Sequence, residues 1–163
     1  LEVWLVNDLP LHAKPTSPAK ALDAVKTATL LGAVRVPADR RDYRDDELRA
    51  GVYTLRLALQ PQDGNHLGTS EFLYFGVLTS AKHDTTPGGI ADYKTLVKAS
   101  SRETSTDHPV ILSLRPPSAS GETPRILQPA PEHQSVLVKV PATAAGEKTV
   151  VLFEIVCEGR AKH

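Results

Sequence analysis

Residues 48–79 place the strongest constraint on what this chain can fold into. In the first arm of this stretch, apolar side chains alternate with small or polar ones, and the apolar set is Tyr53, Leu55, Leu57 and Leu59. A period of two is typical of a β-strand with one face on a core and the other in water. The second arm, 72–78, is apolar on both sides and predicts a strand covered on both faces. The loop between the arms, 61–70, is too long for a two-residue hairpin turn, and an ordered loop of this length is often functional.

The rest of the chain predicts further strands. Apolar runs bounded by turn residues occupy 1–6, 30–36, 110–114, 125–128, 136–140 and 149–157. The run 125–128 lies between prolines, which suits an edge strand, whereas 149–157 predicts a buried central strand. Because strands follow one another through loops, the sequence predicts an all-β fold: an antiparallel β-sandwich of about eight strands, in a single domain over 1–163. We expect one core to contain Tyr53, Leu55, Leu57, Phe75, Val138 and Phe153.

One or two short helices interrupt the predicted strands. Residues 92–101 carry apolar side chains at helical spacing and lack Pro and Gly. Ser17 and Pro18 form an N-cap followed by proline at the first helical position, which predicts a helix over 18–26. The apolar residues of that segment could equally form a strand. The charged segment 38–50 has interspersed signs and is interpreted as a solvated, internally paired loop.

Composition excludes some classes of protein. Nineteen basic and nineteen acidic residues leave no net charge, so no overall field attracts nucleic acid or an anionic membrane, although local patches stay open. No apolar run approaches the roughly 20 residues of a transmembrane segment. The sequence has no methionine and starts within a strand-like segment, so we expect a truncated or processed N-terminus. Cys157, the single cysteine, is interpreted as a small core residue.

Several sequence pieces occur together in a fixed order. They are Leu31-Gly-Ala-Val-Arg-Val-Pro37, Asp42-Tyr-Arg44, Ala50-Gly-Val-Tyr-Thr-Leu-Arg56, the segment 60–69 and His108-Pro-Val-Ile-Leu-Ser-Leu114. In this set the chain resembles a family of secreted bacterial β-sandwich proteins of unassigned function that are seen next to signal peptides. The resemblance implies a secreted, periplasmic or cell-envelope location and supplies no activity. A basic–acidic pair often precedes Phe72 in that family, whereas Ser70 and Glu71 stand here.

The most suggestive chemical constellation is Asp63, His66 and His108. Asp63 and His66 are three residues apart in a turn that contains glycine, and Pro109 restricts His108 to extended backbone. If the loop and the strand end lie together, these side chains suit a divalent metal such as zinc or copper. Alternatively, His66 hydrogen-bonds the loop backbone and His108 packs at the strand end. An imidazole separation above about 8 Å would exclude a shared ion, since each Zn–N bond is about 2.1 Å long.

Two classes of function stay open. The first is a non-catalytic secreted or cell-envelope module with a structural role or with a protein, a glycan or a copy of itself as partner, and no nucleic acid. It is favoured because the sequence has neither a Gly-x-Ser-x-Gly elbow nor a glycine-rich phosphate loop. The second is a metal-binding protein or metal-dependent enzyme that uses 63–66 and His108. Aromatic residues could also line a sugar platform, although aromatics in strands are usually core residues; they are Trp4, Tyr43, Tyr53, Tyr74 and Tyr93.

Overall fold

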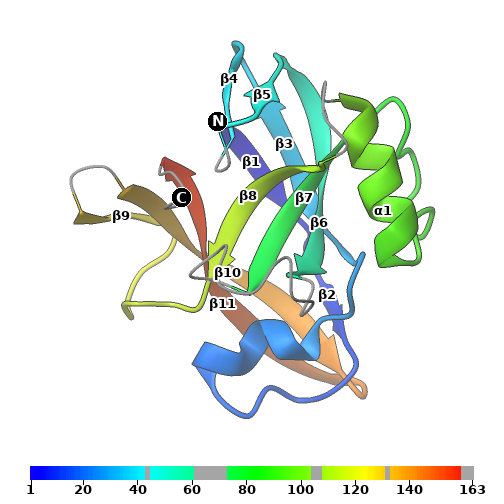
Figure 1. Cartoon of the computed structure of the whole chain (residues 1–163). Helices are drawn as coiled ribbons and strands as arrows, with labels where there is room; N and C mark the ends of the chain where they lie inside the picture. Colours follow the sequence, from blue (N-terminus) through cyan, green and yellow to red (C-terminus); the bar gives the residue numbers. More distant parts are fainter. Residues whose placement is uncertain (43–44, 61–72, 104–107, 131–132, 159–163) are drawn as a thin grey trace.

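The computed structural model describes residues 1–42, 45–60, 73–103, 108–130 and 133–158, and in these ranges the chain is mostly β. The strands are β1 (Glu2–Leu5), β2 (Leu9–Leu11), β3 (Leu30–Val36), β4 (Arg40–Arg41), β5 (Glu47–Leu48), β6 (Gly51–Leu59), β7 (Tyr74–Ser80), β8 (Val110–Arg115), β9 (Arg125–Ala130), β10 (His133–Ala144) and β11 (Glu147–Glu158). The helices are α1 (Tyr93–Ser100) and two 3₁₀ segments, η1 (Pro18–Ala24) and η2 (Ser101–Glu103) (Figure 1).

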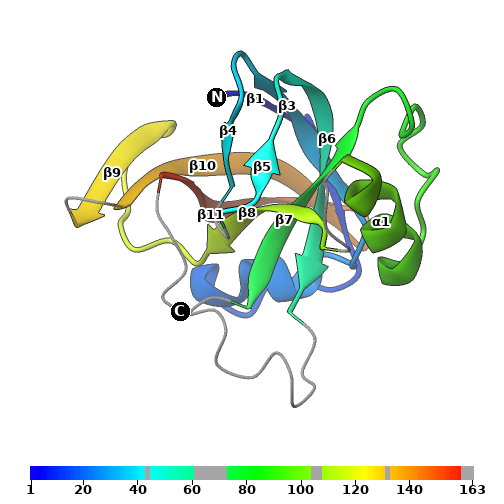
Figure 2. The ribbon, with the colours of Figure 1, turned by 45° about the horizontal axis from the view of Figure 1, so that its top comes forward.

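Nine of the described strands belong to one curled sheet. Its hydrogen-bonded order is β1-β3-β6-β7-β8-β11-β10-β2, and β9 pairs with β10 beside this path. The N-terminal segment supplies both ends of the path, because β1 runs antiparallel to β3 whereas β2 runs parallel to β10. Only residues 6–8 connect β1 to β2, so the two ends of the sheet are held close together. Figures 1 and 2 show the sheet bending around its interior.

The structure agrees with the sequence on strand content and differs on architecture. A mostly-β chain with about eight strands and short helices is confirmed. The strands, however, form one curled mixed sheet instead of two clearly separate antiparallel sheets. Alternation tells which side chains face inward, but it does not tell which strands hydrogen-bond or how far the sheet curls. The parallel pair β2–β10 has no signal in the sequence.

The main core fills the inside of the curl. Of the six residues predicted to share it, five do: Tyr53, Leu55, Leu57, Val138 and Phe153. Phe75 was expected in the same core, and this prediction is wrong. It is half-buried against a second cluster on the outer face of the sheet, beneath α1, together with Val77, Leu96 and Ile111. As predicted, β7 is covered on both faces, but Phe75 belongs to the opposite face from Tyr74 and Leu78.

Two glycines permit close approaches within the sheet. A Cβ atom on Gly76 would lie 2.4 Å from Cδ1 of Leu55, and a Cβ on Gly32 would lie 2.0 Å from the carbonyl oxygen of Trp4. Gly32 also follows a shift in register between β3 and β6. A side chain at Gly32 would therefore push β1 away from β3.

The predicted short helices and the edge strand are present. The helix within 92–101 is α1, whose N-cap Asp92 accepts a hydrogen bond from the Thr95 amide. The segment after Ser17 forms the 3₁₀ helix η1 with Pro18 at its start, although the Ser17 side chain makes no capping bond. The edge strand between prolines is β9, which pairs only with β10 among the described strands. No helix in the described part of the chain is long and apolar enough to cross a bilayer.

The charged segment 38–50 is more ordered than a solvated loop. Within it, β4 and β5 form a small ladder in which Leu48 is buried. Asp42, which follows β4, is 4% exposed. The interpretation of this segment as a solvated loop is therefore wrong for part of it. The alternating charges of this segment gave no indication that two of its side chains, Arg40 and Asp42, hydrogen-bond to strands of the large sheet.

The register of β6 predicts a sharp contrast between two leucines. Leu57 is fully buried in the main core, whereas Leu59 is 39% exposed at the end of the same strand. Replacement of Leu57 by Ala should lower the free energy of unfolding by about 2–5 kcal/mol because it leaves a cavity. Leu59→Ala should change it by about 0.5 kcal/mol or less. Urea unfolding of both variants measures this, and equal losses would contradict the register.

Candidate functional site

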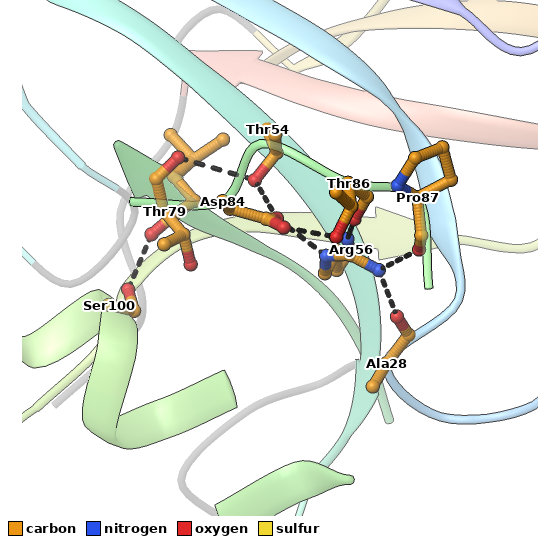
Figure 3. Close-up of polar contacts among 9 residues, drawn as sticks. Ala28, Thr54, Arg56, Thr79, Asp84, Thr86, Pro87 and Ser100 are labelled. Atoms are coloured by element: carbon orange, nitrogen blue, oxygen red, sulfur yellow. Dashed lines mark hydrogen bonds and ion pairs between the residues drawn. The ribbon is translucent and has the colours of Figure 1, made fainter. Parts of the chain in front are cut away.

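Arg56 lies at an outward-facing position of β6, where the alternation predicted contact with water. The side chain is instead 1% exposed, because the segment 81–89 folds over this part of the outer face. A buried guanidinium is costly unless its charge is paired and each of its N–H groups finds an acceptor. The surroundings of Arg56 meet both requirements (Figure 3).

The guanidinium of Arg56 donates five hydrogen bonds, which is the number of N–H groups it carries. Nε and Nη2 bond to the two carboxylate oxygens of Asp84, at 2.6 and 2.8 Å. The remaining donors reach backbone carbonyl oxygens at 2.9 Å, those of Ala28, Thr86 and Pro87. We call Arg56, Asp84, Thr54 and these three carbonyls the Arg56 network. It joins β6 to the segment that precedes β3 and to the segment that follows β7.

Asp84 is the acidic partner in this network, and its side chain is also 1% exposed. Oδ2 accepts from Nε of Arg56 and from the Thr54 hydroxyl at 2.5 Å. Burial by itself raises the pKa of the Asp84 carboxyl, but hydrogen bonds from Arg56 and Thr54 and the charge of Arg56 outweigh it, so the pKa is lowered. Asp84 is therefore a carboxylate at neutral pH.

The polar contacts continue toward α1. The Thr54 hydroxyl lies 3.3 Å from the carbonyl oxygen of Thr79, so its proton goes to the nearer Asp84. Beside Thr79, the Ser100 hydroxyl donates to the carbonyl oxygen of Leu78 at 2.5 Å and accepts from the amide of Val110 at 3.0 Å. Ser100 thus fastens the end of α1 to β7 and to the start of β8, and Figure 3 shows its bond to β7.

A second buried acid holds another loop against the outer face. Glu154 in β11 is fully buried and accepts from the Ser118 amide and hydroxyl, both at 2.6 Å, and from the Ser135 hydroxyl at 2.7 Å. Arg115 lies 3.4 Å away as an ion-pair partner. Burial raises the pKa of Glu154, but the bonds from Ser118 and Ser135 and the charge of Arg115 leave it lowered. The one charge that interrupts the last predicted strand therefore anchors residues 116–118.

The β4–β5 ladder supplies a third set of bonds, at the place where β8 and β11 separate. These strands pair only at Arg115 and Leu114 of β8. Beyond this point, Asp42 accepts from the backbone amides of Ile111 and Asp46, at 3.1 and 2.9 Å. Nη2 of Arg40 donates to the carbonyl oxygen of Cys157 at 2.6 Å. Side chains thus take the place of a strand-to-strand ladder and satisfy backbone groups of β8 and β11.

Next to the Arg56 network the outer face of the sheet is open. In β1, Val3 and Leu5 pack on the core while Trp4 points outward and is 55% exposed. Trp4 lies opposite Ala33, and Arg35 lies opposite both Glu2 and Val52 in the neighbouring strands. Arg35 and Glu2 form an exposed ion pair at 2.7 Å, and Val52 is 50% exposed. We call the surface made by Glu2, Trp4, Ala33, Arg35 and Val52 the outer-strand face.

The aromatic residues divide between core and surface. Tyr53 and Tyr74 are in the main core, as aromatics in strands usually are. Burial and the hydrogen bond from Tyr74 to Asp23 raise the pKa of Tyr74 to about 12, so this hydroxyl is a stable donor. Trp4 and Tyr93 are the exposed aromatics of the described residues, and Tyr43 lies outside them. Of the described aromatic residues that could line a sugar platform, Trp4 has the most exposed side chain.

The predicted metal site is not brought together by the described residues. Asp63 and His66 lie outside the described ranges, and His108 is exposed two residues before the start of β8. The described residues contain no group of three or more His, Cys, Asp or Glu side chains that could hold a metal ion. The constellation therefore stays a prediction. Cys157 is half-buried against the main core, and burial raises the pKa of its thiol.

Sequence reasoning missed the Arg56 network and the anchoring role of Glu154. The signal for both was a charged residue inside a strongly apolar strand. The partners are far away in the sequence, because Asp84 is 28 residues from Arg56 and Ser118 is 36 residues from Glu154.

Comparison of the chain with models of protein families, with curated proteins and with solved structures gives no match. The resemblance to secreted bacterial proteins accordingly stays a prediction.

The Arg56 network predicts a strong dependence of stability on Asp84. Asp84→Ala leaves the guanidinium buried without its partner and should lower the free energy of unfolding by about 3–5 kcal/mol. Replacement of both residues, Arg56→Met with Asp84→Leu, should cost far less than the sum of the single changes. As a control, Glu2→Gln breaks an exposed pair and should cost about 1 kcal/mol or less. Chemical denaturation measures these variants, and similar losses for Asp84→Ala and Glu2→Gln would contradict the assignment.

The sign of the pH dependence follows from the lowered pKa of Asp84. Its contribution to stability is present above the ordinary pKa of 3.8 and is lost as the pH falls from there through the lower pKa of the folded protein. The acid-induced loss should be smaller in the double replacement than in the parent chain.

Proposed function

We propose that the chain is a non-catalytic module of a secreted or cell-envelope protein and that it binds a glycan through the outer-strand face. The single observation that carries this proposal is the exposed indole of Trp4 on a strand whose neighbouring residues are anchored in the core. The resemblance described above supports the location. A protein partner is the alternative ligand class that the experiment below distinguishes.

The outer-strand face has the chemistry that a sugar ring requires. A pyranose presents C–H groups on its faces and hydroxyl groups around its rim, so an indole can cover the apolar face while polar side chains bond to the rim. Arg35 and Glu2 stand at the adjacent register positions and offer donors and acceptors. An exposed ion pair is worth about 0–1 kcal/mol, so exchange of this pair for bonds to hydroxyl groups costs little.

The position of Trp4 is fixed before any ligand arrives. The β1–β3 ladder holds the backbone on one side, and Gly32 allows β1 to approach closely. Val3 and Leu5 anchor alternate positions of the same strand. A pre-ordered aromatic pays less conformational entropy on binding than a mobile one, which favours affinity.

The interior charges support a non-catalytic role. Arg56 uses its five donors on internal acceptors, and both oxygens of Glu154 accept bonds from serines. These charged groups are engaged in holding loops against the sheet. The chemistry that is left exposed on the outer-strand face is stacking and hydrogen bonding.

Trp4 is the single tryptophan of the chain, so intrinsic fluorescence reports directly on this face. Titration with neutral, amino-sugar and uronic-acid oligosaccharides should give a saturable change in emission for at least one class. Calorimetry with that sugar should then show that Trp4→Ala weakens binding by about tenfold or more, as expected for a central aromatic contact. Arg35→Gln should weaken it by a smaller factor.

Ile126 provides a matched control, because it is 64% exposed on the edge strand β9, which pairs with β10 and not with the strands of the outer-strand face. Ile126→Ala should leave sugar affinity unchanged. The proposal fails if no sugar class changes the emission of the parent chain, or if Trp4→Ala binds as tightly as the parent. Binding of a protein that Trp4→Ala abolishes, without sugar binding, would replace the glycan with a protein partner.

A further inference from the structure

The solvent-facing side of α1 and η2 carries three basic side chains at regular spacing. Lys94, Lys98 and Arg102 are each exposed and four residues apart. Within α1, the step of four from Lys94 to Lys98 advances about 40° around the helix and about 6 Å along it. The 3₁₀ segment η2 follows α1 directly and carries Arg102 about one turn further along. The three side chains therefore form a stripe about 12 Å long, which we call the α1 stripe.

The stripe points directly away from the protein. Leu96 and Ser100 are the buried residues of α1, and Lys98 is two residues from each of them, about 160° around the helix. Figures 1 and 2 show α1 standing out from one side of the sheet. On one shoulder of the stripe lie Tyr93, which is 37% exposed, and the half-buried Val97.

Several other exposed cations of the described residues are paired with acidic side chains, whereas those of the α1 stripe are not. Lys14, Arg35, Arg49 and Lys148 each have an exposed acidic partner within 4 Å. Within the described ranges, the three side chains of the stripe make no such pair. Asp92, which precedes the helix, uses its carboxylate on the amide and hydroxyl of Thr95.

Three like charges at helical spacing repel one another, and each i, i+4 pair of this kind destabilises a helix by a few tenths of a kcal/mol. An anionic surface removes this cost and adds a favourable term. We propose that the α1 stripe docks the protein on an anionic lipid surface. This surface is separate from the outer-strand face, and the inference does not depend on glycan binding.

The shape of the site favours a lipid surface over a soluble polyanion. A helix that protrudes from the protein can contact a flat bilayer surface along its length. A protein that binds a polymer chain usually does so in a groove that follows the polymer. Tyrosine beside lysine is also the residue combination found where proteins meet lipid headgroups. Each basic side chain near an anionic bilayer contributes about 1 kcal/mol, which corresponds to about fivefold in affinity.

The test uses the full chain and two kinds of vesicle, one of phosphatidylcholine alone and one that also contains phosphatidylglycerol. Sedimentation should show binding to the anionic vesicles only. The combined variant Lys94→Gln, Lys98→Gln and Arg102→Gln should bind about 100-fold more weakly, from three factors of about five. Raising the salt from about 0.1 to about 1 M should release the parent chain, because the Debye length falls from about 10 to about 3 Å.

A second variant separates the stripe from the overall charge. Lys20→Gln, Lys26→Gln and Lys139→Gln removes the same three charges from exposed positions elsewhere and should bind anionic vesicles as the parent does. Circular dichroism of both variants serves as the control for folding. The proposal is overturned if the parent does not bind anionic vesicles at low salt, if both variants lose binding equally, or if the stripe binds soluble polyphosphate but no vesicle.

Discussion

The structure depends on the pairing of one buried cation with one buried anion. Arg56 is the largest fully buried side chain in the described part of the protein, and it lies outward on a strand whose other face lines the core. Its five donated bonds tie β6 to Asp84 and to three carbonyl groups in two other segments. Removal of Arg56 or Asp84 would leave the other charge buried without an ion-pair partner. The pair therefore holds the segment 81–89 against the sheet. That segment also sets the limit of the uncovered outer face on which Trp4 lies.

The same physical device recurs at two other places in the described part of the sheet. Glu154 holds residues 116–118 through Ser118, while Asp42 and Arg40 satisfy β8 and β11 where these strands separate. A sheet that curls this strongly cannot keep every neighbouring pair in register, so side chains complete the hydrogen bonding. Among the described residues, the outer-strand face and the α1 stripe are two surfaces that this bracing leaves exposed.

Much of the local structure follows from the sequence, and much of the assembly does not. The alternation at Tyr53, Leu55 and Leu57 and the helical spacing around Leu96 gave correct elements, because both patterns express burial within one element. The curl, the parallel β2–β10 pair and the side taken by Phe75 depend on which elements meet, and no local pattern encodes that. Arg56 and the charged segment 38–50 resembled solvated surface for the same reason. For the candidate site, sequence reasoning included Trp4 among possible sugar contacts but could not show that it alone among the strand aromatics described here is exposed to solvent.

Hydrogen exchange of the Arg56 side chain tests the central claim most directly. Nuclear magnetic resonance resolves the Nε proton of each arginine, and Arg35 provides an exposed reference in the same molecule. The closed network predicts that the Arg56 Nε proton exchanges orders of magnitude more slowly than that of Arg35. Asp84→Asn should accelerate this exchange together with that of the amides of residues 84 and 89, which are hydrogen-bonded in the covering segment, while the β10–β11 hairpin is unaffected. Rapid exchange of the Arg56 Nε proton in the parent chain, comparable to that of Arg35, would contradict the account.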